Sequence, residues 1–162
     1  MTRSNDRQRW LFRATVADRA GALTSIAAAF SNRGINIDSI VAHGAEETPG
    51  GTGAVVVTFR GTEEEKEKVR REVARLPKVR RLDEHVYLQD YLRKAAVMLV
   101  KPEQAALRIV EGSGGVTCDL IKDESVGRTY FIAGPPNQVD PVIESLLSDG
   151  FLVDIVYTII AL

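Results

Sequence analysis

The sequence predicts an α+β protein in which the order strand, helix, strand, strand, helix, strand occurs twice. Three observations support this prediction. Apolar residues alternate along short segments typical of strands, they repeat at helical spacing between those segments, and glycine or proline stands at the breaks. A chain of 162 residues, 44% of them hydrophobic and 27% charged, is long enough for two small globular domains. Each half is expected to be a ferredoxin-like sandwich, an antiparallel sheet with two helices on one face.

The first domain is assigned to residues 1–90. Its strands are expected over residues 10–16, 35–43, 54–59 and 79–88. The first helix carries one apolar stripe, formed by Leu23, Ile26, Ala27 and Phe30. Gly34 ends this helix, because glycine suits the left-handed position after a helix. A second helix begins at a capping box made by Thr62 and Glu65, and its charged run, residues 63–72, is interpreted as a solvated face.

The second domain is assigned to residues 91–162 and repeats the same order of elements. Its strands are expected over residues 95–100, 116–121, 128–133 and 151–157. Pro102 is expected to open its first helix, because proline is tolerated in the first turn. The second helix has a clear apolar stripe, formed by Val139, Val142, Ile143, Leu146 and Leu147. Gly150 ends this helix.

Composition excludes several classes of protein. A net charge of −1 gives no overall field that would hold nucleic acid or an anionic membrane. RNA-binding domains with this element order stack bases on aromatic residues of the central strands, but residues 54–58 contain none. The single Cys118 excludes an internal disulfide, and no apolar run reaches the length of a membrane span. The polar opening, residues 1–9, has no signal-peptide core, so a cytoplasmic location is expected.

No catalytic or metal site is predicted. His43 and His85 have no second histidine or cysteine at metal-ligand spacing, so each is interpreted as solvated or structural. Cys118 stands beside Asp119 without a basic neighbour, which favours an inert thiol. The glycines at 50–53 lack the lysine and the helix of a phosphate-binding loop.

The turn between the first strand and the first helix, residues 18–23, has features of a ligand site. Gly21 has no Cβ, so a ligand can approach the backbone there. The free amides at the helix start are donors suited to a carboxylate. Asp18 either caps these amides or meets an ammonium group, and Asn36 offers both a donor and an acceptor. The alternative from the residues alone is that Asp18 only caps the helix and Gly21 is a packing glycine.

Two stretches, Asp18-Arg19-Ala20-Gly21-Ala22-Leu23 and Phe30-Ser31-Asn32-Arg33-Gly34-Ile35-Asn36-Ile37, resemble the ACT domain, a small-molecule sensor of amino-acid metabolism. More narrowly, they resemble the regulatory small subunit of acetohydroxyacid (acetolactate) synthase. The resemblance implies an effector site between two ACT domains. One chain would contribute Asp18, Ala20, Gly21, Ala22 and Leu23, and another would contribute Asn36 and Ile37. The family often has asparagine where Asp18 stands, and an acidic residue there would repel a ligand carboxylate.

The resemblance also implies a non-catalytic regulatory subunit that binds a branched-chain amino acid, valine by family expectation, and controls a separate catalytic subunit. Thiamine diphosphate, Mg²⁺ and FAD would then belong to that partner. The alternative is a free-standing tandem ACT protein that senses another amino acid and regulates a different enzyme or regulator. A homodimer or larger oligomer is expected, because the first sheet leaves open edges with Ile35, Ile37 and Ile40 near them.

Overall fold

The computed structural model describes residues 6–17, 21–47, 50–89 and 91–161. The chain divides into two compact units, Met1–Tyr87 and Leu88–Leu162, and each has a hydrophobic core of its own. Within the described ranges, no helix combines the length and the apolarity needed to cross a membrane.

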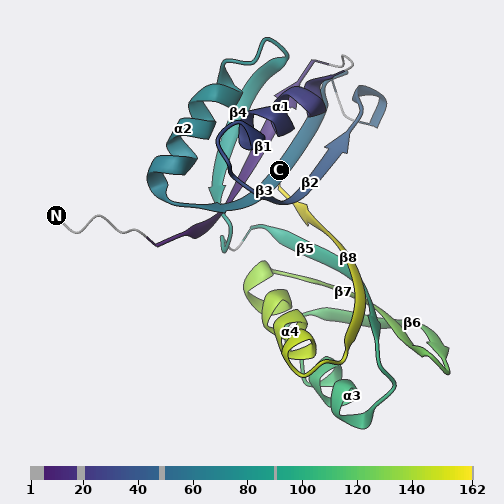
Figure 1. Cartoon of the computed structure of the whole chain (residues 1–162). Coiled ribbons are helices and arrows are strands. Elements are labelled where there is room, and N and C mark those ends of the chain that lie inside the picture. Colours follow the sequence, from purple (N-terminus) through teal and green to yellow (C-terminus); the bar gives the residue numbers. More distant parts are fainter. Residues whose placement is uncertain (1–5, 18–20, 48–49, 90, 162) are drawn as a thin grey trace. The chain divides into compact units, whose positions relative to one another are not determined.

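The first unit has the predicted order of elements. These are β1 (Gln8–Val16), α1 (Ala22–Ser31), β2 (Ile37–His43), the short 3-10 helix η1 (Ala45–Glu47), β3 (Gly53–Gly61), α2 (Glu63–Ala74) and β4 (Val79–Val86). The strands form one sheet in the order β2-β3-β1-β4, with every neighbouring pair antiparallel. Both helices cover the same face of this sheet (Figure 1). The predicted α+β sandwich is therefore confirmed.

Three phenylalanines form the centre of the first core. Phe59 of β3 lies edge-on to Phe12 of β1 and to Phe30 of α1, with 4.9 Å between ring centroids in each pair. The helical stripe differs from the predicted one in part: Ile26 and Phe30 are buried, but Leu23 is 43% exposed and its place is taken by Ala22 and Ala29. Leu23 points elsewhere because the stripe that faces the sheet starts one residue earlier.

Of the three isoleucines expected near the edge of the first sheet, one lies elsewhere. Ile35 precedes β2 and is buried in the core. Ile40 lies in β2 and is 36% exposed, and Ile37 is partly buried. Apolar surface at the β2 edge is thus supplied mainly by Ile40.

The start of α2 follows the sequence prediction closely. The Glu65 amide donates to the Thr62 hydroxyl at 3.2 Å, and the Thr62 amide donates to the Glu65 carboxylate at 2.9 Å. The charged run of α2 is solvated except at Lys66, which is buried over the Trp10 ring at 4.6 Å. Burial opposes the charge of Lys66, but the hydrogen bond from its ammonium to Glu63 and the charge of Glu84 outweigh it and raise its pKa.

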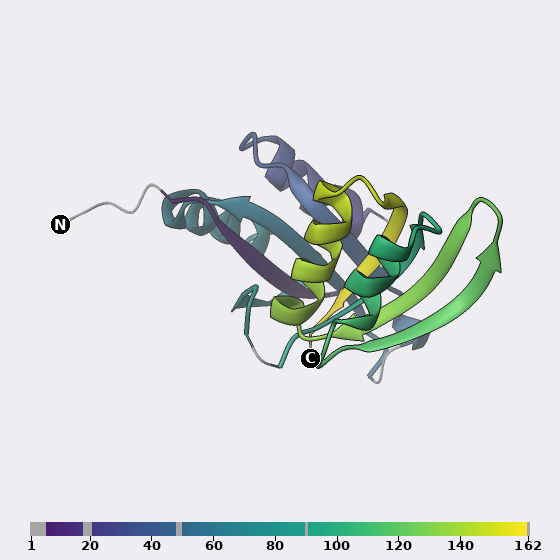
Figure 2. The same cartoon turned by 90° about the horizontal axis from the view of Figure 1, so that it is seen from below.

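The second unit contains β5 (Arg93–Val100), α3 (Gln104–Glu111), β6 (Thr117–Glu124), β7 (Gly127–Gly134), α4 (Pro136–Ser148) and β8 (Leu152–Ile160). Its antiparallel sheet has the order β6-β7-β5-β8, and α3 and α4 lie on one face of it (Figure 2). Two details differ from prediction. Pro102 precedes the helix, whose N-cap is Glu103, and Leu147 is 63% exposed because it faces away from the sheet.

A buried ion pair that the sequence prediction missed lies in the second unit. The Lys94 ammonium is 2.6 Å from Oδ1 of Asp140 on α4 and 4.2 Å from the centre of the Tyr157 ring on β8. Both charged residues are buried. The pair therefore joins β5 to α4 in an environment where unpaired charge is costly.

Candidate functional site

Helix α1 begins directly after Gly21, at the connection that follows β1. Gly21 is the N-cap of α1 and has φ 85° and ψ 4°, a left-handed conformation that favours glycine. Its carbonyl accepts hydrogen bonds from the amide and the hydroxyl of Ser25. Gly21 has no side chain with which to cap α1, and the first turn of α1 has no acidic residue. The first amides of a helix have no acceptor within the helix and suit a negatively charged group.

A small pocket adjoins this turn; we call it the turn pocket. Its volume is about 190 Å³. It is lined by the end of β1, the start of α1, the end of β2 and the start of β3, including Gly21, Ala22, Leu23, Ala42, His43 and Gly44. Apart from His43, the described residues that line it are glycine, alanine, valine and leucine. The pocket is smaller than those that hold drug-sized ligands, and its lining suits a short aliphatic side chain.

The structure brings together part of the predicted site. Gly21, Ala22 and Leu23 line the turn pocket. Asn36 and Ile37 do not. Ile37 begins β2 and Asn36 precedes it, and Ile37 is roughly 20 Å along the strand from His43 at its end. Asp18 and Ala20 lie outside the described residues.

His43 is exposed, which agrees with its interpretation as a solvated histidine, and it also lines the turn pocket. No local motif marks it. The signal is topological: β2 runs antiparallel to β3, with His43 opposite Ala54, and β3 runs antiparallel to β1, with Gly53 opposite Val16. The end of β2 and the end of β1 therefore lie at the same end of the sheet.

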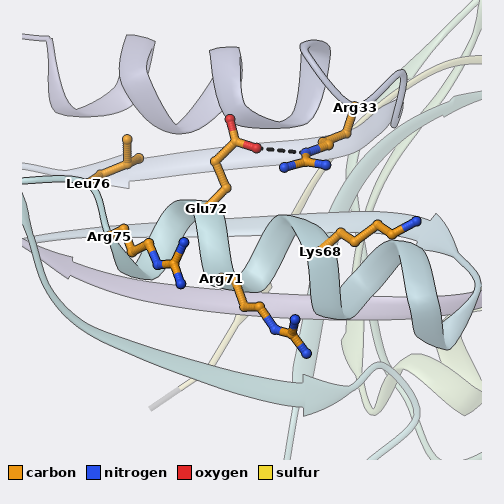
Figure 3. A pocket seen from close by; sticks show the side chains of 6 residues that line it. All are labelled: Arg33, Lys68, Arg71, Glu72, Arg75 and Leu76. Atoms are coloured by element: carbon orange, nitrogen blue, oxygen red, sulfur yellow. Dashed lines mark hydrogen bonds and ion pairs between the residues drawn. The ribbon is translucent and has the colours of Figure 1, made fainter.

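A larger hollow lies between the turn after α1 and the C-terminal half of α2. Its volume is about 620 Å³, and its lining is Arg33, Lys68, Arg71, Glu72, Arg75 and Leu76 (Figure 3). Arg33 pairs with Glu72 at 2.8 Å. Lys68 and Arg71 also pair with glutamates of their own helix. Since Arg33, Lys68 and Arg71 are exposed and each is paired with a carboxylate, we interpret this hollow as a solvated charged surface.

Cys118, the residue considered as a possible nucleophile, lacks the state that nucleophilic chemistry requires. Cys118 is the second residue of β6 and is half-buried. Burial, with a smaller contribution from Asp119, raises the pKa of its thiol, which disfavours the nucleophilic thiolate. Among the described residues, no group of histidine, cysteine, aspartate and glutamate is arranged to hold a metal ion.

The corresponding turn of the second unit is built differently. Between β5 and α3 stand Lys101, Pro102 and Glu103, without a glycine, and Glu103 is the N-cap. A ligand therefore has no glycine beside which to approach the backbone. This contrast assigns the candidate site to the first unit.

Comparisons with known proteins relate the chain to one family model and to solved structures. Residues 12–81 match the family model of the AHAS small subunit-like ACT domain. The crystal structure of the acetolactate synthase small subunit from Thermotoga maritima is similar at a TM-score of 0.68 and 24% identity over 96% of each chain. The regulatory subunit of aspartate kinase from Thermus thermophilus gives a TM-score of 0.44 at 17% identity, over 90% of this chain and 93% of that one. A comparison with curated proteins gives no match.

Residues 12–81 are thus similar to an ACT domain, and the chain is built of two ferredoxin-like units. More particularly, it resembles the small subunit of acetolactate synthase, which is also called acetohydroxyacid synthase.

Proposed function

We propose that this chain is a non-catalytic regulatory subunit that binds a branched-chain amino acid, most simply valine, and controls the catalytic subunit of acetohydroxyacid synthase. The observation that carries the proposal is the turn pocket at the N-terminus of α1, within the residues that match an ACT domain of this type. Amides at the helix start suit the carboxylate of an amino acid, and the aliphatic lining suits its side chain. Thiamine diphosphate, Mg²⁺ and FAD would belong to the partner. A cytoplasmic location is part of the proposal.

The proposal places the effector site between two copies of the chain. β2 is an edge strand of the first sheet, and such edges pair readily with another strand. If two copies of β2 pair antiparallel about their central residue, Ile40, then Ile37 of one lies opposite His43 of the other. Asn36 then lies opposite Gly44, beside the turn pocket. This arrangement unites Asn36 and Ile37 with Gly21, Ala22 and Leu23, and the turn also contains Asp18 and Ala20.

The protein should sediment as a dimer or larger oligomer at micromolar concentration. Ile40→Glu should shift it toward monomer and weaken amino-acid binding, because two carboxylates would face each other across the twofold axis. Val126→Glu is the matched control, since Val126 is an exposed apolar residue of the second unit. Analytical ultracentrifugation measures both. A monomeric parent protein, with or without amino acids, would contradict the two-copy site.

The regulatory role is tested by reconstitution. The chain alone should not condense pyruvate when thiamine diphosphate, Mg²⁺ and FAD are supplied. Added to a purified acetohydroxyacid synthase catalytic subunit from the same cells, it should change the rate of acetolactate formation and make that rate depend on valine. Turnover by the isolated, repurified chain would contradict a regulatory role. Amino-acid binding without any effect on the synthase would favour the alternative, a tandem ACT protein that regulates a different enzyme or regulator.

A further inference from the structure

Strand β8 is an outer edge of the second sheet and is apolar along most of its length. It stands at the end of the order β6-β7-β5-β8 and pairs with β5. Of the residues Leu152–Ile160 that form it, Asp154 alone is charged. Val153, Val156 and Ile160 are 52%, 72% and 51% exposed. A long, apolar edge of this kind is a surface on which another strand can pair.

The opposite edge of the same sheet, β6, has the features that discourage such pairing. Its register with β7 shifts between Leu120 and Lys122, which marks a bulge. It also carries several charged residues, namely Asp119, Lys122, Asp123 and Glu124. Bulges and charges both hinder the approach of a further strand. Residues 154–160 of β8, in contrast, pair with β5 without a shift, so β8 is the edge suited to a partner strand.

Alternate backbone groups of β8 point away from β5. The Ile155 amide donates to Oδ1 of Asp154 at 2.8 Å, so it is directed outward rather than into the ladder with β5. Because this direction alternates along a strand, the amides and carbonyls of Tyr157 and Ile159 are also directed outward, whereas those of Val156 face β5. A partner strand would therefore exchange its hydrogen bonds with Ile155, Tyr157 and Ile159.

We propose that β8 pairs with β8 of a second copy of this chain, antiparallel and centred on Val156. Val156 is the middle residue of Leu152–Ile160, so this register pairs the two strands over their full length. Ile155 of each copy then lies opposite Tyr157 of the other, and the two residues exchange backbone hydrogen bonds. Val156 faces its counterpart as a non-hydrogen-bonded pair across the twofold axis.

Charge favours this register and makes β8 complementary to itself. Asp154 of each copy lies opposite Thr158 of the other, whose hydroxyl can donate to the carboxylate that the Ile155 amide leaves. The two Asp154 carboxylates are about 13 Å apart along the strand. A register centred on Asp154 would instead place them directly opposite each other, which is destabilising. The inference concerns the second unit and goes beyond the effector site proposed in the first.

Disulfide trapping in the full chain tests this register. Cys118→Ser removes the single natural thiol, and either Val156→Cys or Val153→Cys supplies a new one. The Cα atoms of a non-hydrogen-bonded pair are about 4.5 Å apart, within the disulfide range of about 4.4–6.8 Å. The two copies of residue 153 would be about 20 Å apart, although Val153 is exposed on the same strand and is therefore a matched control.

Under mild oxidation, Val156→Cys should shift from the 17.8 kDa monomer to a covalent dimer on a non-reducing gel, while Val153→Cys stays monomeric. The same result is expected when Ile40→Glu is also present, because β8 belongs to the other unit. If Val156→Cys forms no covalent dimer, or Val153→Cys forms it equally well, the inference is wrong and the proposed function is unaffected. Cross-linking that disappears with Ile40→Glu would show that β8 does not associate by itself and would also overturn the inference.

Discussion

Gly21→Asp should abolish the stabilisation of the protein by a branched-chain amino acid while the first unit stays folded. The new carboxylate would stand where the ligand carboxylate is expected, beside Lys78 and the first amides of α1. A β-carbon at Gly21 would lie 2.9 Å from the Lys78 ammonium, which is the flexible end of a side chain and can move. At a hundred times the dissociation constant, valine should stabilise the parent by about 2.7 kcal/mol, and this increment should disappear.

The control for this substitution is Gly34→Asp. Gly34 also has a left-handed φ, 64°, but a β-carbon there would have no atom within 4 Å. Both substitutions therefore carry a similar backbone penalty of about 1–2 kcal/mol, and only the one at Gly21 changes the turn pocket. Thermal unfolding with and without valine measures the response of each. If Gly21→Asp still responds to valine like the parent, the turn is structural and the effector-site assignment is wrong.

Local signals in the sequence were sufficient to predict the elements of the fold. Thr62 and Glu65 form the predicted capping box, and Gly34 adopts the predicted left-handed conformation after α1. Both depend on residues close together in the chain, so their types and spacing determine the outcome. Glycine at position 21 is also explained by its local conformation, with φ 85°.

Features that depend on contacts between distant segments were missed. Lys66 looks like part of a solvated run until β1 places Trp10 beneath it. The Lys78 ammonium lies beside Gly21, and His43 lines the same pocket as Gly21. No spacing in the sequence connects these residues, because their proximity follows from strand order and from the conformation of the α2–β4 connection. The pairing of Lys94 with Asp140 could not be predicted for the same reason.

Lys94→Met should destabilise the second unit by about 3–5 kcal/mol, because it leaves the Asp140 carboxylate buried without its cation. Chemical denaturation followed by far-ultraviolet circular dichroism measures the loss. The double substitution Lys94→Met with Asp140→Leu should recover much of it, since removing both charges avoids a buried unpaired group. An equal loss in the single and double variants would show that packing of the Lys94 stem, rather than its charge, is what matters.

Lys122→Met is the matched control for this prediction. Lys122 pairs with Glu124 at 2.6 Å, the same distance as in the buried pair, but its side chain is 61% exposed, compared with 6% for Lys94. Water screens such an exposed pair and both side chains lose rotational freedom on pairing, so its loss should cost no more than about 1 kcal/mol. The comparison isolates burial, because distance and charge type are held constant. If both lysine variants lose the same stability, the ion pair of the second core contributes no more than a surface pair, and its retention needs another explanation.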